Sequence, residues 1–313
     1  MKTKTLATLL IVLSGAFWGS MGIFVRYFNG YGVQSMEIVE IRAICALVTM
    51  FLFILIKDRS LFKINIKHLW CFIGTGVVGI MFFNWCYFTT IKATSLSVAA
   101  VLMYTAPIFV MLISALLFKE KITVIKVIAL VMAFVGCMLV GGVFAGEAVL
   151  NAKGLIVGIM AGVGYALYTV FTRYAVNYGY SPMTIMFYTF LCGAITGLFL
   201  ADFEIIGTFI AISPVKLVII SLIMGLVTTA IPNVLYTFGL QNVDNGRASV
   251  MASVEPVMAT IYGIFIFHEI PTFIGFVGII LVLGALTLLN LNFGGKKIHE
   301  GTDYEGTDYE GTD

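Results

Sequence analysis

Charged residues are scarce in this 313-residue chain. Lysine and arginine together number 18 and aspartate and glutamate 16, so that 11% of the residues are charged, against about 25% in soluble domains. The net charge of +2 provides no basic surface for nucleic acid. Hydrophobic residues make up 60% of the chain instead, above the roughly 45–50% of soluble domains. This balance excludes a soluble globular domain, a disordered chain and a nucleic-acid-binding protein.

Residues that support enzyme chemistry are also few. Only three histidines occur, and all lie in predicted loops or in the C-terminal tail. The five cysteines stand singly in apolar stretches without a C-x-x-C pair, which argues against a disulfide framework and against a metal site. The sequence also lacks an H-E-x-x-H motif and a phosphate-binding loop. We therefore expect no enzyme activity and no cofactor.

Long apolar stretches fill almost the whole chain. A bilayer crossing needs about 20 mostly apolar residues, and ten such windows precede Phe293. They fall near residues 6–27, 35–56, 69–90, 97–118, 123–143, 154–175, 182–202, 215–239, 248–267 and 272–292. The sequence thus predicts an all-α membrane protein with ten transmembrane helices in a lipid bilayer.

The distribution of lysine and arginine predicts the orientation of these helices, because these residues collect on the cytoplasmic side of membrane proteins. With the N-terminus inside, eleven of them lie on the inner side and three on the outer side, when the four arginines in or at the ends of spans (Arg26, Arg42, Arg173 and Arg247) are left out. The inner set is Lys2, Lys4, Lys57, Arg59, Lys63, Lys67, Lys119, Lys121, Lys126, Lys296 and Lys297, and the outer set is Lys92, Lys153 and Lys216. We predict a multi-pass protein of the plasma (inner) membrane with both termini cytoplasmic.

The chain contains an internal repeat. Shifted by 149 positions, residues 76–123 fall on residues 225–272 with ten identities, and the uncommon residues Asn, Tyr, Pro and Glu are among them. The pairs are Gly76/Gly225, Val78/Val227, Asn84/Asn233, Tyr87/Tyr236, Ala99/Ala248, Val101/Val250, Pro107/Pro256, Phe118/Phe267, Glu120/Glu269 and Thr123/Thr272. A shift of 147 also places Gly15 on Gly162 and Arg26 on Arg173.

The repeat divides the chain into two five-helix units, residues 1–146 and 147–295. Residues 296–313 carry E-G-T-D-Y repeats with nothing to bury, which predicts a disordered acidic tail or an appended sequence. Because each unit has an odd number of spans, the second enters the membrane from the opposite face. Inverted repeats of this kind place a substrate site near the midplane and support alternating access, here by rocking of the two halves.

Six segments of the sequence resemble the EamA family of the drug/metabolite transporter superfamily. They are Leu13–Phe28 (LSGAFWGSMGIFVRYF), Ser35–Ala43 (SMEIVEIRA), Leu96–Pro107 (LSVAAVLMYTAP), Phe118–Ile122 (FKEKI), Arg247–Pro256 (RASVMASVEP) and Phe267–Pro271 (FHEIP). The resemblance covers about residues 6–292. It implies ten helices in two inverted repeats, a central cavity lined by spans 1–4 and 6–9, and spans 5 and 10 at the periphery. It also implies export of amino acids, aromatic compounds or other small metabolites.

Glu255 is the sharpest candidate for a functional residue. It lies eight residues into the ninth span, directly before Pro256, which removes a backbone donor from the helix. A buried, unpaired carboxyl group at this depth holds a proton at neutral pH. Two interpretations stay open: a proton-coupling or substrate-amine site, and a structural carboxyl group bonded to the backbone or facing a wet vestibule. The first repeat has Ala106 at this position.

Arg42, near the outer end of the second span, matches the second-span arginine of the family. This match suggests that Arg42 faces the cavity or pairs with another helix. The alternative is that the guanidinium snorkels to lipid headgroups. Two glutamates, Glu37 and Glu40, lie nearby on one face of the same helix, three residues apart.

The repeated polar pairs Asn84/Asn233 and Tyr87/Tyr236 share helix faces, because Asn and Tyr are three residues apart in each repeat. They are predicted either to bind a polar solute or to join helices by hydrogen bonds.

Trp18, Tyr104 and Tyr165 supply further aromatic groups inside predicted spans. Trp18 aligns with Tyr165 across the repeats, so both are predicted to project toward one central space. The alternative is an interfacial aromatic belt.

The sequence therefore predicts a secondary carrier that exports small organic metabolites by alternating access, driven by the proton gradient. An uncoupled uniporter, an importer and a membrane scaffold or binding protein are the alternatives. The predicted substrate-binding residues are Trp18, Arg42, Asn84, Tyr87, Tyr104, Tyr165, Asn233 and Tyr236, and Glu255 is the predicted proton-coupling residue. The expected partners are a small-molecule substrate, lipid and protons; the sequence leaves the oligomeric state open.

Overall fold

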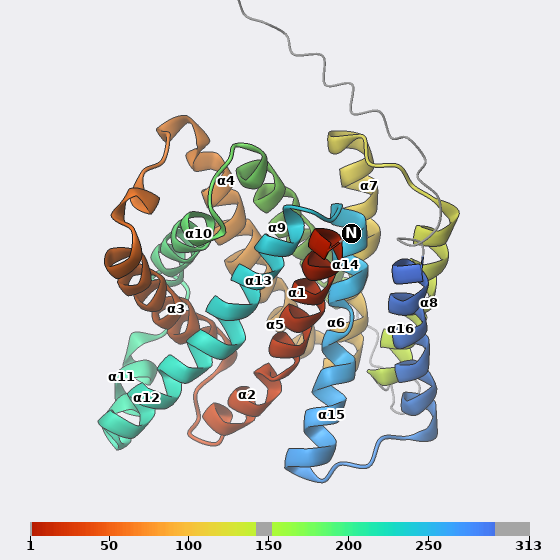
Figure 1. The fold of residues 1–313 in the computed structure, drawn as a ribbon. Helices are drawn as coiled ribbons and strands as arrows, with labels where there is room; N and C mark the ends of the chain where they lie inside the picture. Colours follow the sequence, from red (N-terminus) through yellow and green to blue (C-terminus); the bar gives the residue numbers. More distant parts are fainter. Residues whose placement is uncertain (1, 142–151, 292–313) are drawn as a thin grey trace, which may run out of the picture.

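The computed structural model describes residues 2–141 and 152–291, and every regular element among them is a helix (Figure 1). The first repeat contains α1 (Lys2–Gly19), α2 (Met21–Asn29), α3 (Ser35–Lys57), η1 (Arg59–Phe62), η2 (Ile66–His68), α4 (Leu69–Ile73), η3 (Gly74–Phe82), α5 (Phe83–Ala93), α6 (Leu96–Met103), α7 (Ala106–Phe118) and α8 (Val124–Val140). The second contains α9 (Ala152–Asn177), α10 (Pro182–Gly197), α11 (Phe203–Ile212), α12 (Pro214–Gly225), η4 (Leu226–Ala230), α13 (Ile231–Leu240), α14 (Asn245–Ala252), α15 (Glu255–Phe267) and α16 (Phe273–Leu291).

Seven helical segments of the described residues are long and apolar enough to cross a membrane. Four shorter apolar helices accompany them: Val124–Val140, Pro182–Gly197, Phe203–Ile212 and Phe273–Leu289. Three of these shorter helices coincide with predicted spans, whereas Phe203–Ile212 lies between the seventh and eighth windows. The all-helical membrane fold is confirmed, and the count of ten crossings stays a prediction. The boundary proposed at residues 146 and 147 and the C-terminal tail lie outside the described residues.

The predicted repeat recurs in the helix boundaries themselves. The bounds of α14 and α15 lie 149 positions after those of α6 and α7 at both ends of each helix. Lys119 and His268, which follow α7 and α15, share a left-handed backbone with φ of 54° and 56°. Gly32 and Gly179, 147 positions apart, both have φ of 82° before α3 and α10. Equivalent positions of the two repeats therefore adopt the same backbone conformation, even where the residue differs.

The two repeats are inverted. Glu120, just after the end of α7, accepts a hydrogen bond from the amide of Asn245 at the start of α14. Likewise Arg26 near the end of α2 pairs with Glu269 after the end of α15. The end of α7 thus lies where α14 begins, so the equivalent helices α7 and α15 run in opposite directions. We call the end that carries Glu120 the basic end, because Lys119, Lys121 and Lys126 surround it, and the other the opposite end.

The helices pack across the repeats rather than within them. α1 packs against α13, α14 and α15, and its equivalent α9 packs against η3, α5, α6 and α7. We call α1 together with α2, α13, α14 and α15 the α1 unit. We call α9 together with η3, α5, α6 and α7 the α9 unit. α3 packs on α10 at one side of the bundle and α8 packs on α16 at the other (Figure 1). The peripheral place of α8 and α16 matches what the family resemblance implies for spans 5 and 10.

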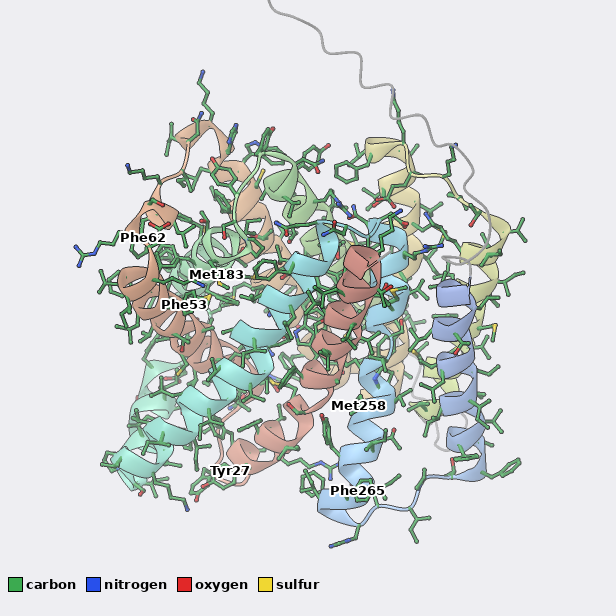
Figure 2. The ribbon with its side chains drawn as sticks, viewed as in Figure 1. Tyr27, Phe53, Phe62, Met183, Met258 and Phe265 are labelled. Carbon is green, nitrogen blue, oxygen red and sulfur yellow. The ribbon has the colours of Figure 1, made fainter. Side chains whose placement is uncertain are left out.

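Large apolar side chains cover the outside of the bundle (Figure 2). Phe265 on α15 is 77% exposed, and Phe53 on α3 also faces outward. In water such a surface would drive aggregation, whereas in a bilayer it contacts acyl chains at no cost. The surface therefore suits a protein embedded in lipid.

Candidate substrate-binding site

Two broken helices meet at the centre of the predicted site. The fourth span breaks between α6 and α7, and the ninth breaks between α14 and α15. Each break precedes a proline, Pro107 or Pro256, at the start of the following helix. A proline cannot donate the backbone hydrogen bond that would continue the ladder. Each break is a single tight turn, because the amides of Thr105 and Val254 still donate to the carbonyls of Leu102 and Met251. Interrupted helices are typical of substrate and ion sites in carriers.

Glu255 is the first residue of α15. A carboxylate in this position is stabilised by the positive end of the helix dipole. Although its neighbours Val254 and Pro256 are buried, Glu255 keeps partial exposure. Its side chain thus borders space that its neighbours leave unfilled, which favours the site interpretation over a structural carboxyl group enclosed by backbone.

The backbone of this break packs directly against α1. A Cβ atom on Gly19 would lie 2.7 Å from the carbonyl oxygen of Glu255 and 2.9 Å from the amide of Ala259. A Cβ atom on Gly15 would lie 3.0 Å from the carbonyl oxygen of Ala252. In the other repeat a Cβ atom on Gly162 would lie 2.9 Å from the carbonyl oxygen of Leu102. Glycines in the first helix of each repeat therefore hold that helix against the broken helix.

Arg42 projects from α3 and is held in place by Asn84. The guanidinium donates from Nη2 to Oδ1 of Asn84 at 3.1 Å. The amide of Asn84 in turn donates to the carbonyl of Ile80 at 2.8 Å, and Asn84 is buried. Arg42 itself is partly exposed and interacts electrostatically with Glu255. The bond to buried Asn84 thus holds the guanidinium against α5, which favours the helix-pairing interpretation of Arg42 over snorkelling.

Three tyrosines share the electrostatic environment of Glu255. Tyr87, Tyr104 and Tyr165 all interact with its carboxylate, and all three are partly exposed. They come from α5, the break after α6, and α9. Glu255 thus shares an electrostatic environment with four other predicted site residues, Arg42, Tyr87, Tyr104 and Tyr165, and their joint role in a substrate site stays a prediction.

Aromatic rings continue from these tyrosines to Trp18. The ring of Trp18 lies 6.4 Å from Tyr165 in an edge-to-face arrangement and 5.4 Å from Tyr236. Phe83 joins Tyr165 at 5.4 Å to Tyr87 at 6.1 Å. The row crosses from the α9 unit to the α1 unit inside the bundle, so these rings do not form an interfacial belt.

Asn233 and Tyr236 join helices instead of facing the same space. Both are buried. Asn233 accepts a hydrogen bond from the hydroxyl of Tyr168 at 2.6 Å, and the hydroxyl of Tyr236 lies 3.1 Å from that of Thr169. These bonds connect α13 to α9, which favours the structural interpretation of this pair. Tyr168 was not among the predicted site residues, although it lies three residues after Tyr165 on the same helix.

Glu40 occupies a different environment from Arg42. Its side chain is 0% exposed, and neither carboxylate oxygen has a hydrogen-bond partner among the described residues. The carboxyl group packs against Gly197 at the end of α10, where a Cβ atom would overlap it. Glu37, one turn earlier, accepts a hydrogen bond from the amide of Asp202 at 3.3 Å. Neither glutamate joins the group around Glu255.

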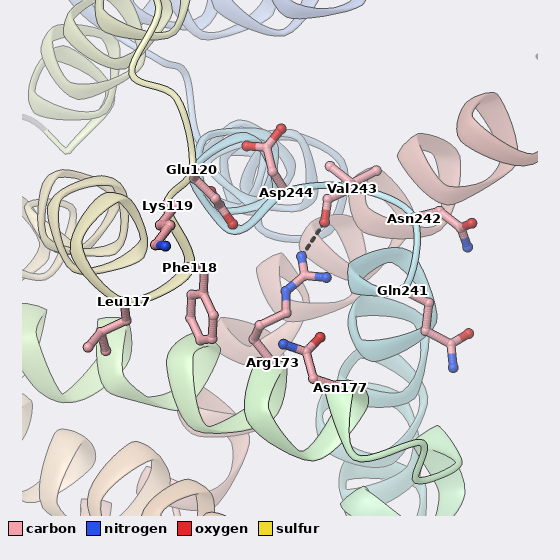
Figure 3. Close-up of a pocket in the computed structure, with 10 residues that line it drawn as sticks. All are labelled: Leu117, Phe118, Lys119, Glu120, Arg173, Asn177, Gln241, Asn242, Val243 and Asp244. Carbon is pink, nitrogen blue, oxygen red and sulfur yellow. Dashed lines mark hydrogen bonds between the residues drawn. The ribbon is translucent and has the colours of Figure 1, made fainter. Parts of the chain in front are cut away.

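The basic end carries an open depression of about 460 Å³ (Figure 3). Its lining comes from α7, α9 and the connection between α13 and α14: Leu117, Phe118, Lys119, Glu120, Arg173, Asn177, Gln241, Asn242, Val243 and Asp244. None of the nine predicted site residues lines it. The depression therefore lies apart from the group around Glu255.

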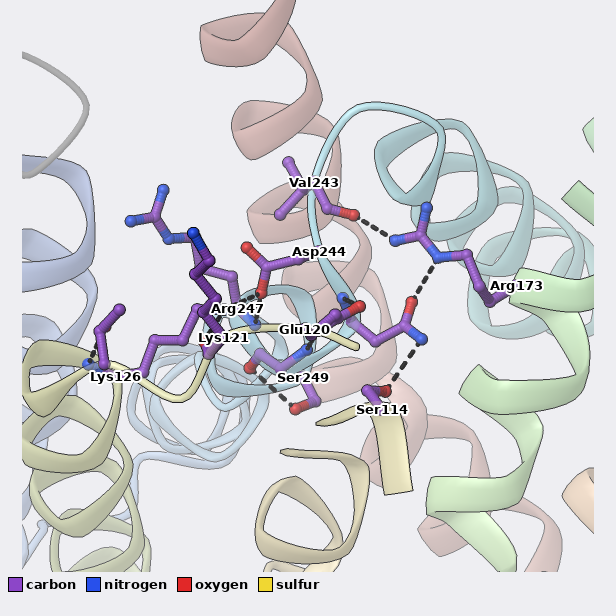
Figure 4. Close-up of polar contacts among 12 residues, drawn as sticks. Ser114, Glu120, Lys121, Lys126, Arg173, Val243, Asp244, Arg247 and Ser249 are labelled. Carbon is purple, nitrogen blue, oxygen red and sulfur yellow. Dashed lines mark hydrogen bonds and ion pairs between the residues drawn. The ribbon is translucent and has the colours of Figure 1, made fainter. Parts of the chain in front are cut away.

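A hydrogen-bond network that includes Arg173 and Glu120 of this lining joins the two units (Figure 4). Arg173 donates to Oδ1 of Asn245 at 2.6 Å and to the carbonyls of Leu240 and Val243. Glu120 accepts from the amides of Asn245 at 2.9 Å and of Gly246 at 3.2 Å. We call these contacts the basic-end latch. They close the bundle at this end, because Arg173 and Glu120 belong with the α9 unit and their partners with the α1 unit.

The sequence profile of the EamA-like transporter family matches residues 5–142 and 152–291. The chain belongs to this family. An uncharacterized transporter of Archaeoglobus fulgidus is 27% identical over 89% of this chain and 94% of its own length. The uncharacterized transporter YxxF of Bacillus subtilis is 26% identical over 96% of both chains, and the uncharacterized inner membrane transporter YicL of Salmonella typhimurium is 23% identical over 90% and 94%.

A solved protein structure shares the fold of this EamA-like chain. The TM-score is 0.74 at 17% identity, and the match covers 91% of this chain and 96% of the other. The resemblance to the EamA family is thus confirmed, and so is a multi-pass membrane protein of a transporter family. Family membership implies a small-molecule substrate and a lipid bilayer around the helices.

Proposed function

We propose that this EamA-like protein is a secondary carrier that exports a small organic metabolite by alternating access, coupled to protons. The observation that supports this proposal best is the position of Glu255. Its carboxyl group lies at a helix break, keeps partial exposure, and interacts electrostatically with Arg42 of the other repeat.

The chemistry of the site suggests the class of solute. A carboxylate and a guanidinium complement the amine and the carboxylate of a zwitterion. The aromatic row from Trp18 to Tyr87 offers a wall for an apolar or aromatic side chain. Amino acids and aromatic amines therefore fit best. A proton on Glu255 would compete with the amine, which links proton binding to release of the solute.

The packing indicates which parts would move. A rocking motion of the two sequence repeats would break the extensive contacts of α1 with α13–α15 and of α9 with α5–α7. Rocking of the α1 unit against the α9 unit preserves these contacts. The expected moving bodies are therefore these mixed units rather than the two five-helix halves that the repeat alone predicts.

Transport into proteoliposomes tests the proposal. Saturable uptake of amino acids or aromatic amines that depends on a pH gradient is expected. Saturable flux that survives collapse of the gradient would support an uncoupled uniporter instead. The absence of flux for every solute in the panel would favour a membrane scaffold and overturn the proposal. The predicted cytoplasmic location of both termini has its own test. Protease added outside intact cells should cleave neither end of the chain.

A further inference from the structure

The pair formed by Arg26 and Glu269 at the opposite end does not connect the two units. Nη1 of Arg26 lies 2.6 Å from Oε1 of Glu269, and the guanidinium stacks over the ring of Phe267 at 4.4 Å. Arg26 comes from α2 and the other two from the end of α15, so all three belong to the α1 unit. The side chains of Arg26 and Glu269 are 54% and 50% exposed. At this end the pair leaves the two units unlatched.

The repeat relates this pair to the basic-end latch. Arg26 and Arg173 are equivalent at the 147-residue offset, and Glu269 and Glu120 at the 149-residue offset. Arg173 and Glu120 reach across to the α13–α14 connection, whereas their equivalents bind each other. The same two side chains thus exist in two arrangements in one molecule, one crossed and one uncrossed.

The place where a second crossed arrangement would form is also present. The equivalent of the α13–α14 connection is the α5–α6 connection of the α9 unit. The two connections are capped alike: the hydroxyl of Ser95 accepts from the amide of Val98 at 3.2 Å, and the carboxylate of Asp244 accepts from the amide of Arg247 at 2.9 Å. These are equivalent residues at the 149-residue offset. The α5–α6 connection therefore has the backbone form that the latch requires.

We propose that Arg26 and Glu269 are the second latch of the carrier. When the opposite end closes, Glu269 leaves Arg26 and accepts hydrogen bonds from the first amides of α6, at Leu96 and Ser97. Arg26 then donates to the carbonyls at the end of α5, the equivalents of those that Arg173 binds. The first amides of a helix have no partner within it and attract a carboxylate. This inference rests on the proposed function, because a carrier needs both ends to close in turn.

The two latches differ in strength. Asn245, which bonds Arg173 and also donates to the hydroxyl of Ser114 at 3.0 Å, is replaced at the equivalent position by Leu96. Lys126 pairs with Asp244 at 2.9 Å, and their equivalents are Gly275 and Ser95, which cannot form an ion pair. The basic-end latch thus has more polar contacts. We infer that closure at the basic end is the resting state.

Cysteine cross-linking tests the second latch. The pair Glu269→Cys and Ser97→Cys would be introduced into a chain whose five native cysteines are replaced by alanine. Its matched control is the equivalent pair, Glu120→Cys and Gly246→Cys. In the structure a Cβ atom on Gly246 would lie 3.8 Å from Oε2 of Glu120, within reach of a short thiol-specific cross-linker. The control therefore reports the arrangement that the structure shows.

We expect the control pair to cross-link rapidly and the 269–97 pair slowly, because the reagent traps a minor state. Adding Arg173→Gln, which weakens the basic-end latch, should increase the yield of the 269–97 cross-link several-fold. No 269–97 cross-link in that background, while the control pair reacts, would overturn the proposal. Cross-linking needs no solute, so a failure to transport would refute the proposed function without changing this result.

The exchange Arg26→Glu with Glu269→Arg provides a second measurement. It preserves the exposed ion pair but replaces the acceptor for the α6 amides by an arginine, which cannot accept a hydrogen bond. The exchanged protein is expected to elute as a folded protein in gel filtration. It should no longer close at the opposite end. Membrane-impermeant thiol reagents should therefore reach the cavity from the opposite end only. Labelling from both ends, as in the parent protein, would assign the pair a merely structural role and overturn the proposal.

Discussion

Replacing Gly19 by alanine should separate α1 from the broken ninth span. The new methyl group would lie 2.7 Å from the carbonyl oxygen of Glu255 and 2.9 Å from the amide of Ala259. Carbon atoms normally make contact at about 3.5–4.0 Å, so α1 must move away by roughly 1 Å. Both neighbours are backbone atoms of α15 and cannot turn aside as a side chain can. Overpacking of this kind costs about 1–3 kcal/mol.

Gly22 provides the matched control for this substitution. It follows Gly19 by three residues and lies in the first turn of the adjoining helix α2, yet a Cβ atom there meets no atom within 4 Å. Gly22→Ala should keep or slightly raise the stability, because alanine favours a helix over glycine by up to about 1 kcal/mol.

Thermal unfolding in detergent and flux into proteoliposomes, measured on both variants, decide the matter. We expect Gly19→Ala to lower both the Tm and the flux, since the displaced helix shifts the backbone that carries Glu255. Equal Tm and equal flux for the two alanine variants would refute the argument that α1 needs a close approach at this point.

Three further predictions concern single residues. Glu255→Gln should remove the dependence of flux on the pH gradient while gel filtration shows an intact protein; an unchanged pH profile would exclude a coupling role. Asn84→Ala deprives the Arg42 guanidinium of its 3.1 Å acceptor and should raise the KM roughly tenfold, which corresponds to about 1.4 kcal/mol, with an unaltered KM as the contrary result. Burial raises the pKa of Glu120, and the amides of Asn245 and Gly246 oppose this only in part. The unfolded chain therefore releases that proton at a lower pH than the folded protein. The wild type should lose stability relative to Glu120→Gln as the pH rises from the ordinary glutamate pKa of about 4.3 to the higher pKa of the folded protein; parallel Tm curves would contradict this.

The sequence alone predicted the features that depend on residue type at a fixed spacing. The 149-residue offset recurs in the bounds of the α6–α7 and α14–α15 segments, whereas the sequence predicted unbroken spans at 97–118 and 248–267 and missed the two breaks before Pro107 and Pro256. It also placed Glu255 at membrane depth. The repeat is visible in both the sequence and the structure because residue type fixes backbone geometry locally, whereas the depth of Glu255 in the membrane stays a prediction.

Helix partners could not be predicted in the same way. In a membrane, lipid and neighbouring helices present equally apolar surfaces, so hydrophobic periodicity does not indicate which face meets which helix. The packing of α1 on the second repeat therefore had no sequence signal. For the same reason Asn233 and Tyr236 could not be assigned between solute and structure until Tyr168 and Thr169 were seen opposite them. The π-helical stretches at Gly74–Phe82 and Leu226–Ala230 also left no recognisable pattern.

The alanine that occupies the position equivalent to Glu255 in the first repeat has a consequence for proton coupling. Ala106 begins α7 as Glu255 begins α15, and it is fully buried. The two backbone halves are near copies, but an ionisable group stands on only one of them. Under the proposed coupling role, exchanging the residues at 106 and 255 would carry the proton-binding group to the oppositely oriented repeat.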